Sequence, residues 1–307
     1  MVLETSYVGS VTHKETALVD QNPFILGTDT RLLNTQPGIL PDGSNGFSYL
    51  DTFANVVSAN YNSLEASLTK RITGNRWLGN SYFTLAYTWG KSIDDASGFR
   101  NVNSEVPYYN HDLFRAVSDY DIAHRIAFSG GWDLPFDQLW ASGPRRLTKG
   151  WSLYPILTWR TGFPMDIPSQ LYTTGSDPGP SGAGDAGIVR ANLTTLHVPI
   201  LNPRQSGSYW FDPTLFNTIY DPAVFTYGTY PRNYLRGPHR GNLDFAVAKK
   251  TAIFRERLNA EFRVEFFNIL NHAEFELPTL NIEDPSFGQI TSTYDPRIIQ
   301  LALRLTF

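Results

Sequence analysis

The feature of this chain that most limits its fold is an alternation of apolar and polar residues, which recurs in eight separate segments. A two-residue period is typical of a β-strand whose two faces meet different surroundings. Most of the segments are as long as the roughly 9–11 residues that a tilted strand needs to cross a bilayer. The eight segments are residues 2–9, 57–71, 81–91, 121–133, 150–161, 242–254, 258–271 and 297–307. The sequence therefore predicts an all-β, antiparallel fold with about eight spanning strands.

The charged residues indicate which phase of each segment is polar. In the last segment one phase is apolar and consists of Leu301, Leu303, Leu305 and Phe307. The charged residues that fall on the opposite phase of their own segments are Glu65, Arg125, Arg160, Asp244, Glu261, Arg263, Glu265 and Arg304. Lys70 and Lys249 are exceptions, but both lie near strand ends, where a lysine can reach the membrane interface. In a membrane barrel the polar phase faces the lumen, so we expect these eight residues to line it.

Tryptophan lies at both ends of the apolar phase. Trp89 and Trp159 end two segments at one rim, and Trp132 and Trp151 lie at the opposite rim. A soluble β-sandwich also alternates, but it has no need for aromatic residues at both ends of its apolar faces. Two aromatic girdles are typical of a membrane barrel.

The connections between the segments also alternate, in length. The long connections are residues 10–56, 92–120, 162–241 and 272–296, and the short ones are 72–80, 134–149 and 255–257. Outer-membrane barrels have long extracellular loops and short periplasmic turns. If the last strand ends in the periplasm, every short connection lies on that side. Pro155 fits the pattern badly, because proline has no N–H for a strand ladder, and we expect a bulge or a displaced strand boundary there.

Composition excludes several other classes of protein. The net charge of -4 gives no electrostatic reason to expect nucleic acid. The absence of cysteine excludes disulfides and thiolate metal sites. No apolar run is long enough for a transmembrane helix. No signal peptide follows Met1, which for an outer-membrane protein leads us to expect that the start of the gene product is missing.

The glycine-rich stretch 174–187 does not match a binding motif. It lacks the Gly-Lys-Ser/Thr ending of a phosphate loop, and Asp177 and Asp185 do not have the spacing of a calcium loop. A surface loop is the favoured interpretation.

Two groups of polar residues raise the question of catalysis. The segment DYDIAHR offers Asp119, Asp121 and His124, for which a metal or acid–base site is conceivable and a rim position with local hydrogen bonds is favoured. Glu261 and Glu265 lie four residues apart on one strand face, about 13 Å, which is too far for either geometry of glycoside hydrolysis. The sequence therefore indicates no catalytic residue, no cofactor and no metal.

The chain resembles a known family in stretches that spread over nearly its whole length. They are NYNSLEASLTKR, SYFTLAYTWGKSIDD, AHRIAFSGGWDLPF, GWSLYPILTWRTGFP, EFRVEFFNILNHAEFELP and FGQITSTYDPRIIQLALRLTF. With these stretches the chain is similar to the Oar-like TonB-dependent receptors, whose barrel carries an N-terminal carboxypeptidase-regulatory-like domain. The resemblance implies a barrel of about 22 strands with a plug inside it, energised by the TonB complex. It also implies that the last strand, through Leu301, Leu303, Leu305 and Phe307, is the signal that the barrel assembly machinery reads.

These observations leave three hypotheses. In the first, residues 1–307 are the C-terminal barrel part, without plug or regulatory-like domain, of a Gram-negative outer-membrane transporter that imports a large solute. Its partners are outer-membrane lipid, the assembly machinery, the TonB complex through the missing N-terminal part, and an unknown solute at the extracellular loops, chiefly 162–241. The fragment alone is not expected to transport. The second is a complete eight-stranded barrel acting as an adhesin or structural protein, and the third is a soluble carbohydrate-binding or hydrolytic β-protein. The first predicts an open, curved sheet, and the second predicts a ladder between residues 2–9 and 298–307.

Overall fold

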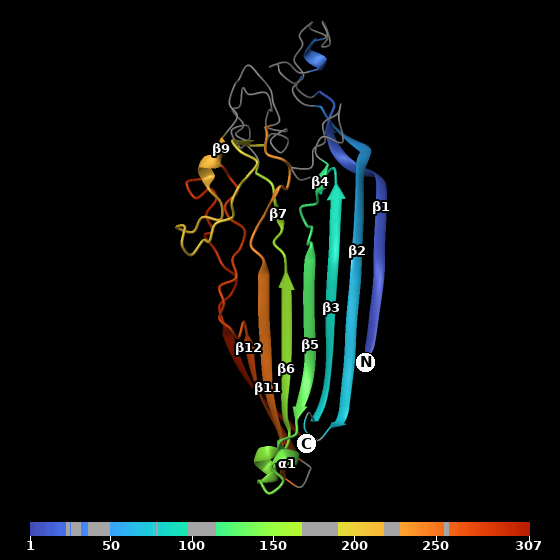
Figure 1. Cartoon of the computed structure of the whole chain (residues 1–307), viewed down its shortest axis with the longest axis vertical. Helices are drawn as coiled ribbons and strands as arrows, with labels where there is room; N and C mark the ends of the chain where they lie inside the picture. Colours follow the sequence, from blue (N-terminus) through green and yellow to red (C-terminus); the bar gives the residue numbers. More distant parts are fainter. Residues whose placement is uncertain are drawn as a thin grey trace.

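The computed structural model describes residues 1–22, 25, 32–35, 50–75, 77, 79–97, 115–167, 190–217, 228–254 and 258–307. The described chain forms one large antiparallel sheet, in which each long strand pairs with its neighbours along the sequence (Figure 1). The long strands are β1 (Val2–Asp20), β2 (Asp51–Asn75), β3 (Gly79–Asp94), β5 (His124–Leu134), β6 (Trp151–Arg160), β11 (Arg240–Phe254), β12 (Leu258–Phe267) and β13 (Ile298–Thr306). The predicted all-β class and all eight predicted strands are confirmed.

Several predicted boundaries were wrong. The hairpin of β1 and β2 continues to Asp20 and Asp51, so much of the predicted loop 10–56 is strand, interrupted by a bulge near Lys14. Strand β12 ends at Phe267, because Asn268 and Asn271 adopt left-handed backbone angles that turn the chain out of the sheet. Alternation alone did not show where either pairing stops.

The connections at the two ends of the sheet differ as predicted. At one end, called the turn end, β2 and β3 are separated by three residues, and 134–149 holds two short helices, α1 (Phe136–Leu139) and α2 (Arg145–Thr148). Residues 255–257 lie outside the described part. The opposite, loop end carries the described parts of the long connections and the small strands, of which β4, β7 and β9 are labelled in the upper half of Figure 1. These small strands are β4 (Ala116–Val117), which pairs with β3, β7 (Pro164–Met165) with β10 (Leu235–Arg236), and β8 (Asn192–Leu193) with β9 (Phe216–Asn217).

The sheet is open. Strand β1 pairs with β2 and strand β13 with β12, and in the described chain no ladder joins β1 to β13. The expectation of an open sheet is confirmed, and the ladder that the small-barrel hypothesis requires is absent from these strands.

The register places the charged residues on a common face. Residues directly opposite each other in an antiparallel pair lie on the same face of the sheet. One row of such pairs runs from Glu65 through Thr88, Arg125 and Arg160 to Arg240. Continuing this rule through all ladders puts one set on a single face, called the polar face: Glu65, Arg125, Arg160, Asp244, Glu261, Arg263, Glu265 and Arg304. That the polar face lines a lumen stays a prediction of the barrel rule.

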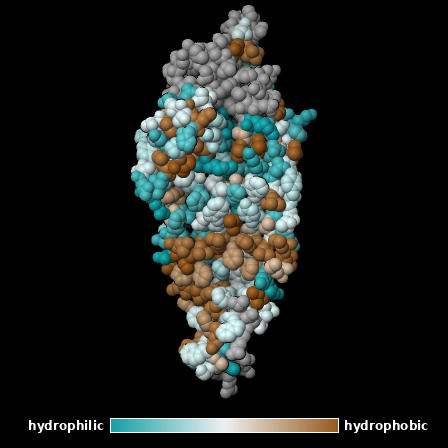
Figure 2. All heavy atoms as spheres, in the orientation of Figure 1, coloured by the Kyte–Doolittle hydropathy of each residue, from teal (hydrophilic) through white to brown (hydrophobic). Residues whose placement is uncertain are grey.

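Within the described part of the chain, no residues cover the opposite, apolar face. Leu301 and Leu303 on β13 are each 66% exposed. Figure 2 shows the hydrophobic side chains gathered in a band across the strands, with hydrophilic side chains between this band and the loop end. A continuous exposed apolar band of this kind marks a surface that another apolar phase covers. Among the described residues, no helix is long and apolar enough to cross a membrane.

Pro155 remains inside β6, and both alternatives expected from the sequence were wrong. The β5–β6 ladder keeps the same register before and after the proline, so there is no bulge. Instead the ladder lacks the pairs that would join Tyr154 and Pro155 to Gly131 and Gly130, while Pro155 still pairs with Phe245 on the other side. The missing N–H is thus accommodated by a local gap in the ladder opposite two glycines.

Two substitutions on β13, one on each face, test which face of the strand meets lipid. Leu303 lies at the centre of the apolar phase of β13, so Leu303→Arg should destabilise the membrane-inserted protein by roughly 2–4 kcal/mol, whereas Arg304→Leu should be tolerated. Folded barrel is scored by heat-modifiable gel mobility in the full-length protein. Equal folding of the two variants would contradict the facing.

Candidate functional site

Small and polar side chains dominate the polar face. The small residues on it include Ser67, Ala86, Ala127, Ser129, Gly131, Ala246, Ala248 and Ala302. Such side chains leave space above the sheet instead of filling it, which suits a strand wall that borders a wide lumen.

Near the turn end, the basic residues that β11, β12 and β13 place on the polar face lie beside or opposite carboxylates. The Lys250 Nζ atom lies 3.5 Å from Glu261, and the Arg263 Nε atom lies 2.7 Å from Glu265. Arg304 is directly opposite Glu261 in the β12–β13 ladder. Opposite charges at facing positions stabilise a sheet, so these pairs favour the register of β11, β12 and β13.

Near the loop end, the polar face carries an unbalanced row. Arg125, Arg160 and Arg240 are directly paired across β5, β6 and β11. The predicted residue Asp244 lies further along β11, where its carboxylate accepts hydrogen bonds from the Asn242 side chain and the Asn268 backbone.

The four predicted girdle tryptophans all lie on the apolar face. In the register, Trp159 pairs with Ile126 and Trp151 pairs with Leu134, so their levels on β5 are eight residues apart. Eight residues of extended strand span about 27 Å. This matches the apolar band of roughly 25 Å that aromatic girdles flank in outer-membrane barrels. Trp89 pairs with His124, two residues beyond the level of Trp159, and Trp132 lies on β5 two residues inside the level of Trp151.

Two polar residues of the apolar face, Lys249 and His124, lie at its margins. Lys249 donates to the backbone carbonyl of Lys149 in the turn and lies over the ring of Trp151, 5.5 Å from its centroid. His124 stacks on Trp89 and bonds through Nδ1 to the Tyr87 hydroxyl at 2.8 Å. Both polar groups therefore lie beside aromatic residues at the ends of the apolar band.

Beyond the strands, the described parts of the two long connections fold together around an apolar core, called the outer module. Its buried members are Met165, Ile167, Ala191, Phe211, Phe216, Tyr230, Leu235 and Phe287. The Phe211 and Phe287 ring centroids lie 5.4 Å apart in an edge-on arrangement, although one residue comes from connection 162–241 and the other from 272–296. The sequence predicted only long loops for these stretches. The aromatic residues of SYWFDPTLF were the missed signal.

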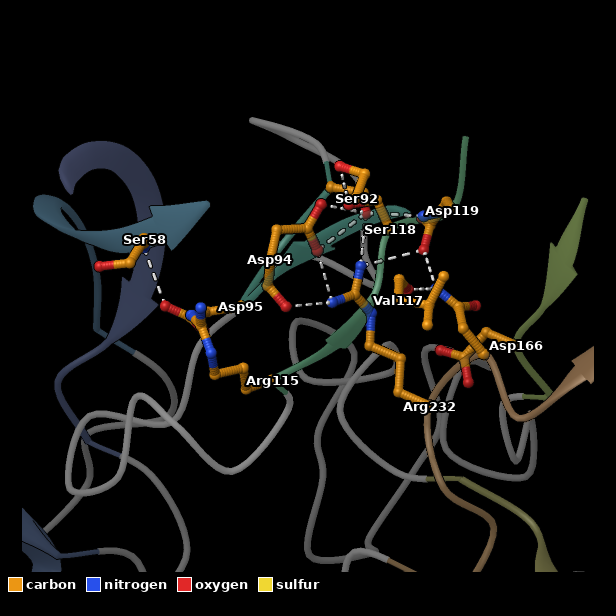
Figure 3. A network of polar contacts seen from close by, with 12 residues as sticks. Ser58, Ser92, Asp94, Asp95, Arg115, Val117, Ser118, Asp119, Asp166 and Arg232 are labelled. Carbon is orange, nitrogen blue, oxygen red and sulfur yellow. Dashed lines mark hydrogen bonds and ion pairs between the residues drawn. The ribbon is translucent and has the colours of Figure 1, made fainter. Parts of the chain in front are cut away.

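A buried ion network joins the outer module to the strands (Figure 3). The Arg232 guanidinium lies 2.8 Å from Asp94 at the end of β3 and 3.0 Å from Asp119 before β5. Asn233 donates to Asp119 and to the Val117 carbonyl. Burial lowers the pKa of Arg232, but Asp94 and Asp119 outweigh it and raise that pKa above its usual value. Arg232 is therefore a charged clamp on the ends of two strands.

Further ion pairs extend this clamp. Arg236 pairs with Asp121 and also donates to the Gly162 carbonyl at 3.1 Å. Arg190 pairs with Asp166 inside the outer module at 2.8 Å. Arg115 binds Asp95, whose second oxygen accepts the Ser58 backbone N–H.

The geometry gives the acidic residues of DYDIAHR a structural role. Asp119 and Asp121 accept hydrogen bonds from arginines of the outer module, as expected for a rim position with local bonds. In the described ranges, no group of three or more acidic or histidine residues is placed to hold a metal ion. The glycine-rich stretch 174–187, with Asp177 and Asp185, lies outside them.

Comparison with protein-family models agrees with this architecture. A family model described as an outer membrane beta barrel domain matches residues 1–300. Among solved structures, the chain is similar to the outer membrane transporter YddB from Escherichia coli, with 8% identity and a TM-score of 0.49. The alignment covers 99% of this chain and 30% of that one, so the chain spans less than a third of the transporter's length. No curated protein matches the sequence.

Removing the clamp should free the outer module while leaving the sheet intact. Arg232→Ala leaves Asp94 buried without its main partner, and breaking such a pair costs about 3–5 kcal/mol. We expect proteinase K to cut the full-length protein within residues 190–236 much faster in intact cells, with unchanged heat-modifiable mobility. The matched control is Arg146→Ala, an exposed arginine at the turn end. Digestion of Arg232→Ala at the control rate would contradict the clamp.

Proposed function

Because the chain belongs to the family of outer membrane beta barrel domains, we propose that it is the C-terminal barrel part of a TonB-dependent transporter that imports a large solute. The chain lies in the outer membrane, with its apolar face toward lipid and its polar face toward the lumen. An N-terminal part of the same protein supplies the remaining strands, the plug and the contact with the TonB complex. The barrel assembly machinery inserts the protein, reading the last strand with Leu301, Leu303, Leu305 and Phe307.

The observation that carries this proposal is the open sheet with a small-residue polar face. In the described chain, β1 pairs only with β2 and β13 pairs only with β12, so each of these two strands has one edge without a neighbouring strand. Bare edges are not tolerated in the hydrocarbon core, because water is not there to satisfy their N–H and C=O groups. Further strands must therefore pair with both edges, which makes the barrel wider than eight strands.

The charges of the polar face favour a wide barrel as well. In a closed ring of eight strands the interior barely holds packed side chains. Glu65, Arg160, Arg263, Glu265 and Arg304 would all share that space. Charges crowded away from water are costly unless every one is paired. In a wide lumen the same residues meet water or a plug, and this difference is the argument against the small adhesin barrel.

The outer module is the part proposed to meet solute first. A cleft of about 350 Å³ opens in it, lined by apolar residues such as Phe163 and Leu277 and by polar residues such as Asp166 and Asn233. The clamp on β3 and β5 holds these walls in place before a solute arrives. We further propose that the chain binds and passes solute without chemical conversion and is not an enzyme.

Channel conductance tests the width of the barrel. We expect the full-length protein, once its proposed plug segment is deleted, to form large KCl-conducting pores in planar bilayers, because barrels well above eight strands leave an aqueous channel. The intact protein is the matched closed control. A deletion variant that inserts and still does not conduct would contradict the wide barrel.

A second measurement on the same protein separates energy coupling from barrel width. The full-length protein should bind the purified periplasmic domain of TonB, and deletion of its N-terminal segment should abolish that binding. Absence of binding by the full-length protein would reject TonB dependence and leave the wide barrel standing.

A further inference from the structure

Three arginines of the polar face oppose one another directly. Arg125 on β5 pairs with Arg160 on β6, and Arg160 pairs with Arg240 on β11. Strands lie about 4.8 Å apart, so the three positions span roughly 10 Å in a line. Like charges at directly opposite positions destabilise a sheet. The three positive charges of this arginine row therefore repel one another when no anion is bound beside them.

The rest of the face makes the row unusual. On β11, β12 and β13 near the turn end, each described basic residue of the polar face has a carboxylate beside or opposite it. Within the described part of the chain, none of the three row arginines forms an ion pair with a carboxylate. On the same face, Glu65 lies two strands from Arg125, and Asp244 lies four residues along β11 from Arg240, about 13 Å.

Aromatic rings hold two of the guanidinium groups in place. Arg160 lies over the Phe163 ring, 4.0 Å from its centroid, and Arg240 lies over the Tyr294 ring at 3.7 Å. Tyr294 also influences Arg160 electrostatically, so one residue of connection 272–296 acts on two arginines of the row. A ring against the face of a guanidinium leaves the N–H groups at its edge, which is where a carboxylate or phosphate binds in a bidentate manner.

The nearby carboxylates do not fill this role. Glu274 accepts the Gly241 N–H with one oxygen and contacts His272 with the other. Asp121 is occupied by Arg236. One N–H of Arg160 donates to the Thr161 carbonyl at 3.3 Å, but each guanidinium has five N–H donors. The row therefore keeps most of its N–H groups for a ligand or for water.

We propose that the arginine row is a binding site for an anionic solute carrying two or more carboxylate or phosphate groups within about 10 Å. The row lies at the level of Trp159, the girdle of the loop end, but on the opposite face. This inference rests on the proposed function, because it takes the polar face as the lumen wall. A solute that leaves the outer module would meet the row at the mouth of the lumen. Lipid phosphates lie on the other face and cannot reach it.

Calorimetry on the purified full-length protein tests the site with two soluble probes, inorganic pyrophosphate and citrate, at low salt. Wild type should bind at least one of them, and Arg160→Gln, the central substitution, should weaken that binding at least about tenfold, as loss of charge-assisted hydrogen bonds does. The triple variant Arg125→Gln/Arg160→Gln/Arg240→Gln should not bind. Raising the salt should weaken wild-type binding.

The matched control is Arg263→Gln, because Arg263 is on the same face but already pairs with Glu265. It should bind the probes like wild type, and all variants should keep heat-modifiable mobility. Three results overturn the site: no binding of either probe by wild type, equal loss in the control, or loss of lipopolysaccharide binding with unchanged probe binding in the triple variant. None of these results bears on conductance or on TonB binding, so the proposed function is tested separately.

Discussion

The structure depends on one constraint, the need to satisfy backbone hydrogen bonds where water is absent. In hydrocarbon, an unpaired N–H or C=O group costs several kcal/mol, so spanning strands must pair along both edges. The eight long strands meet this need by pairing in sequence order. Pairing fixes the register, and the register sends alternate side chains to opposite faces. The apolar face, the polar face and the tryptophan levels all follow from this ladder, including its gap at Pro155 opposite Gly130 and Gly131.

Outside the bilayer, water can satisfy the backbone, so the outer module is stabilised in a different way from the sheet. There the chain has water, so irregular backbone is tolerated and stability comes from an apolar core and buried ion pairs. Phe211 and Phe287 supply the core, and Arg232 joins it to β3 through Asp94. The charges of the sheet are arranged by register, whereas those of the module are arranged by folding of the loops. The arginine row lies where these two systems meet, with its rings supplied by Phe163 and Tyr294 of the long connections.

The fold was largely predictable because a two-residue period needs only local sequence. The alternation in 297–307 was enough to place Leu303 and Arg304 on opposite faces, and the structure puts them there. Strand ends were less predictable, because the stop of β12 depends on left-handed asparagines and the extension of β1 on pairing with distant residues. The clamp was not predicted, since Arg232 and Asp94 are far apart in the sequence. The arginine row was also missed. Arg125 and Arg160 were assigned to the polar phase, but Arg240 lies outside the predicted strand 242–254, and only the register shows that the three face each other.

The central claim is that these strands are an arc of a wider barrel. The most direct test is the distance between β1 and β13 in the membrane. The chain has no cysteine, so spin labels at Ser6→Cys and Ala302→Cys report one distance in a full-length protein freed of other cysteines. Seven steps between neighbouring strands, each about 4.8 Å, separate the labels by roughly 34 Å across the sheet, and the ladders offset them by eight residues, about 27 Å, along it. The labels therefore lie roughly 40 Å apart in a flat sheet and somewhat less in a curved arc. A distance of roughly 30–40 Å by electron–electron double resonance is the predicted result. A distance of about 10 Å would contradict the account, because it would mean that the two strands pair.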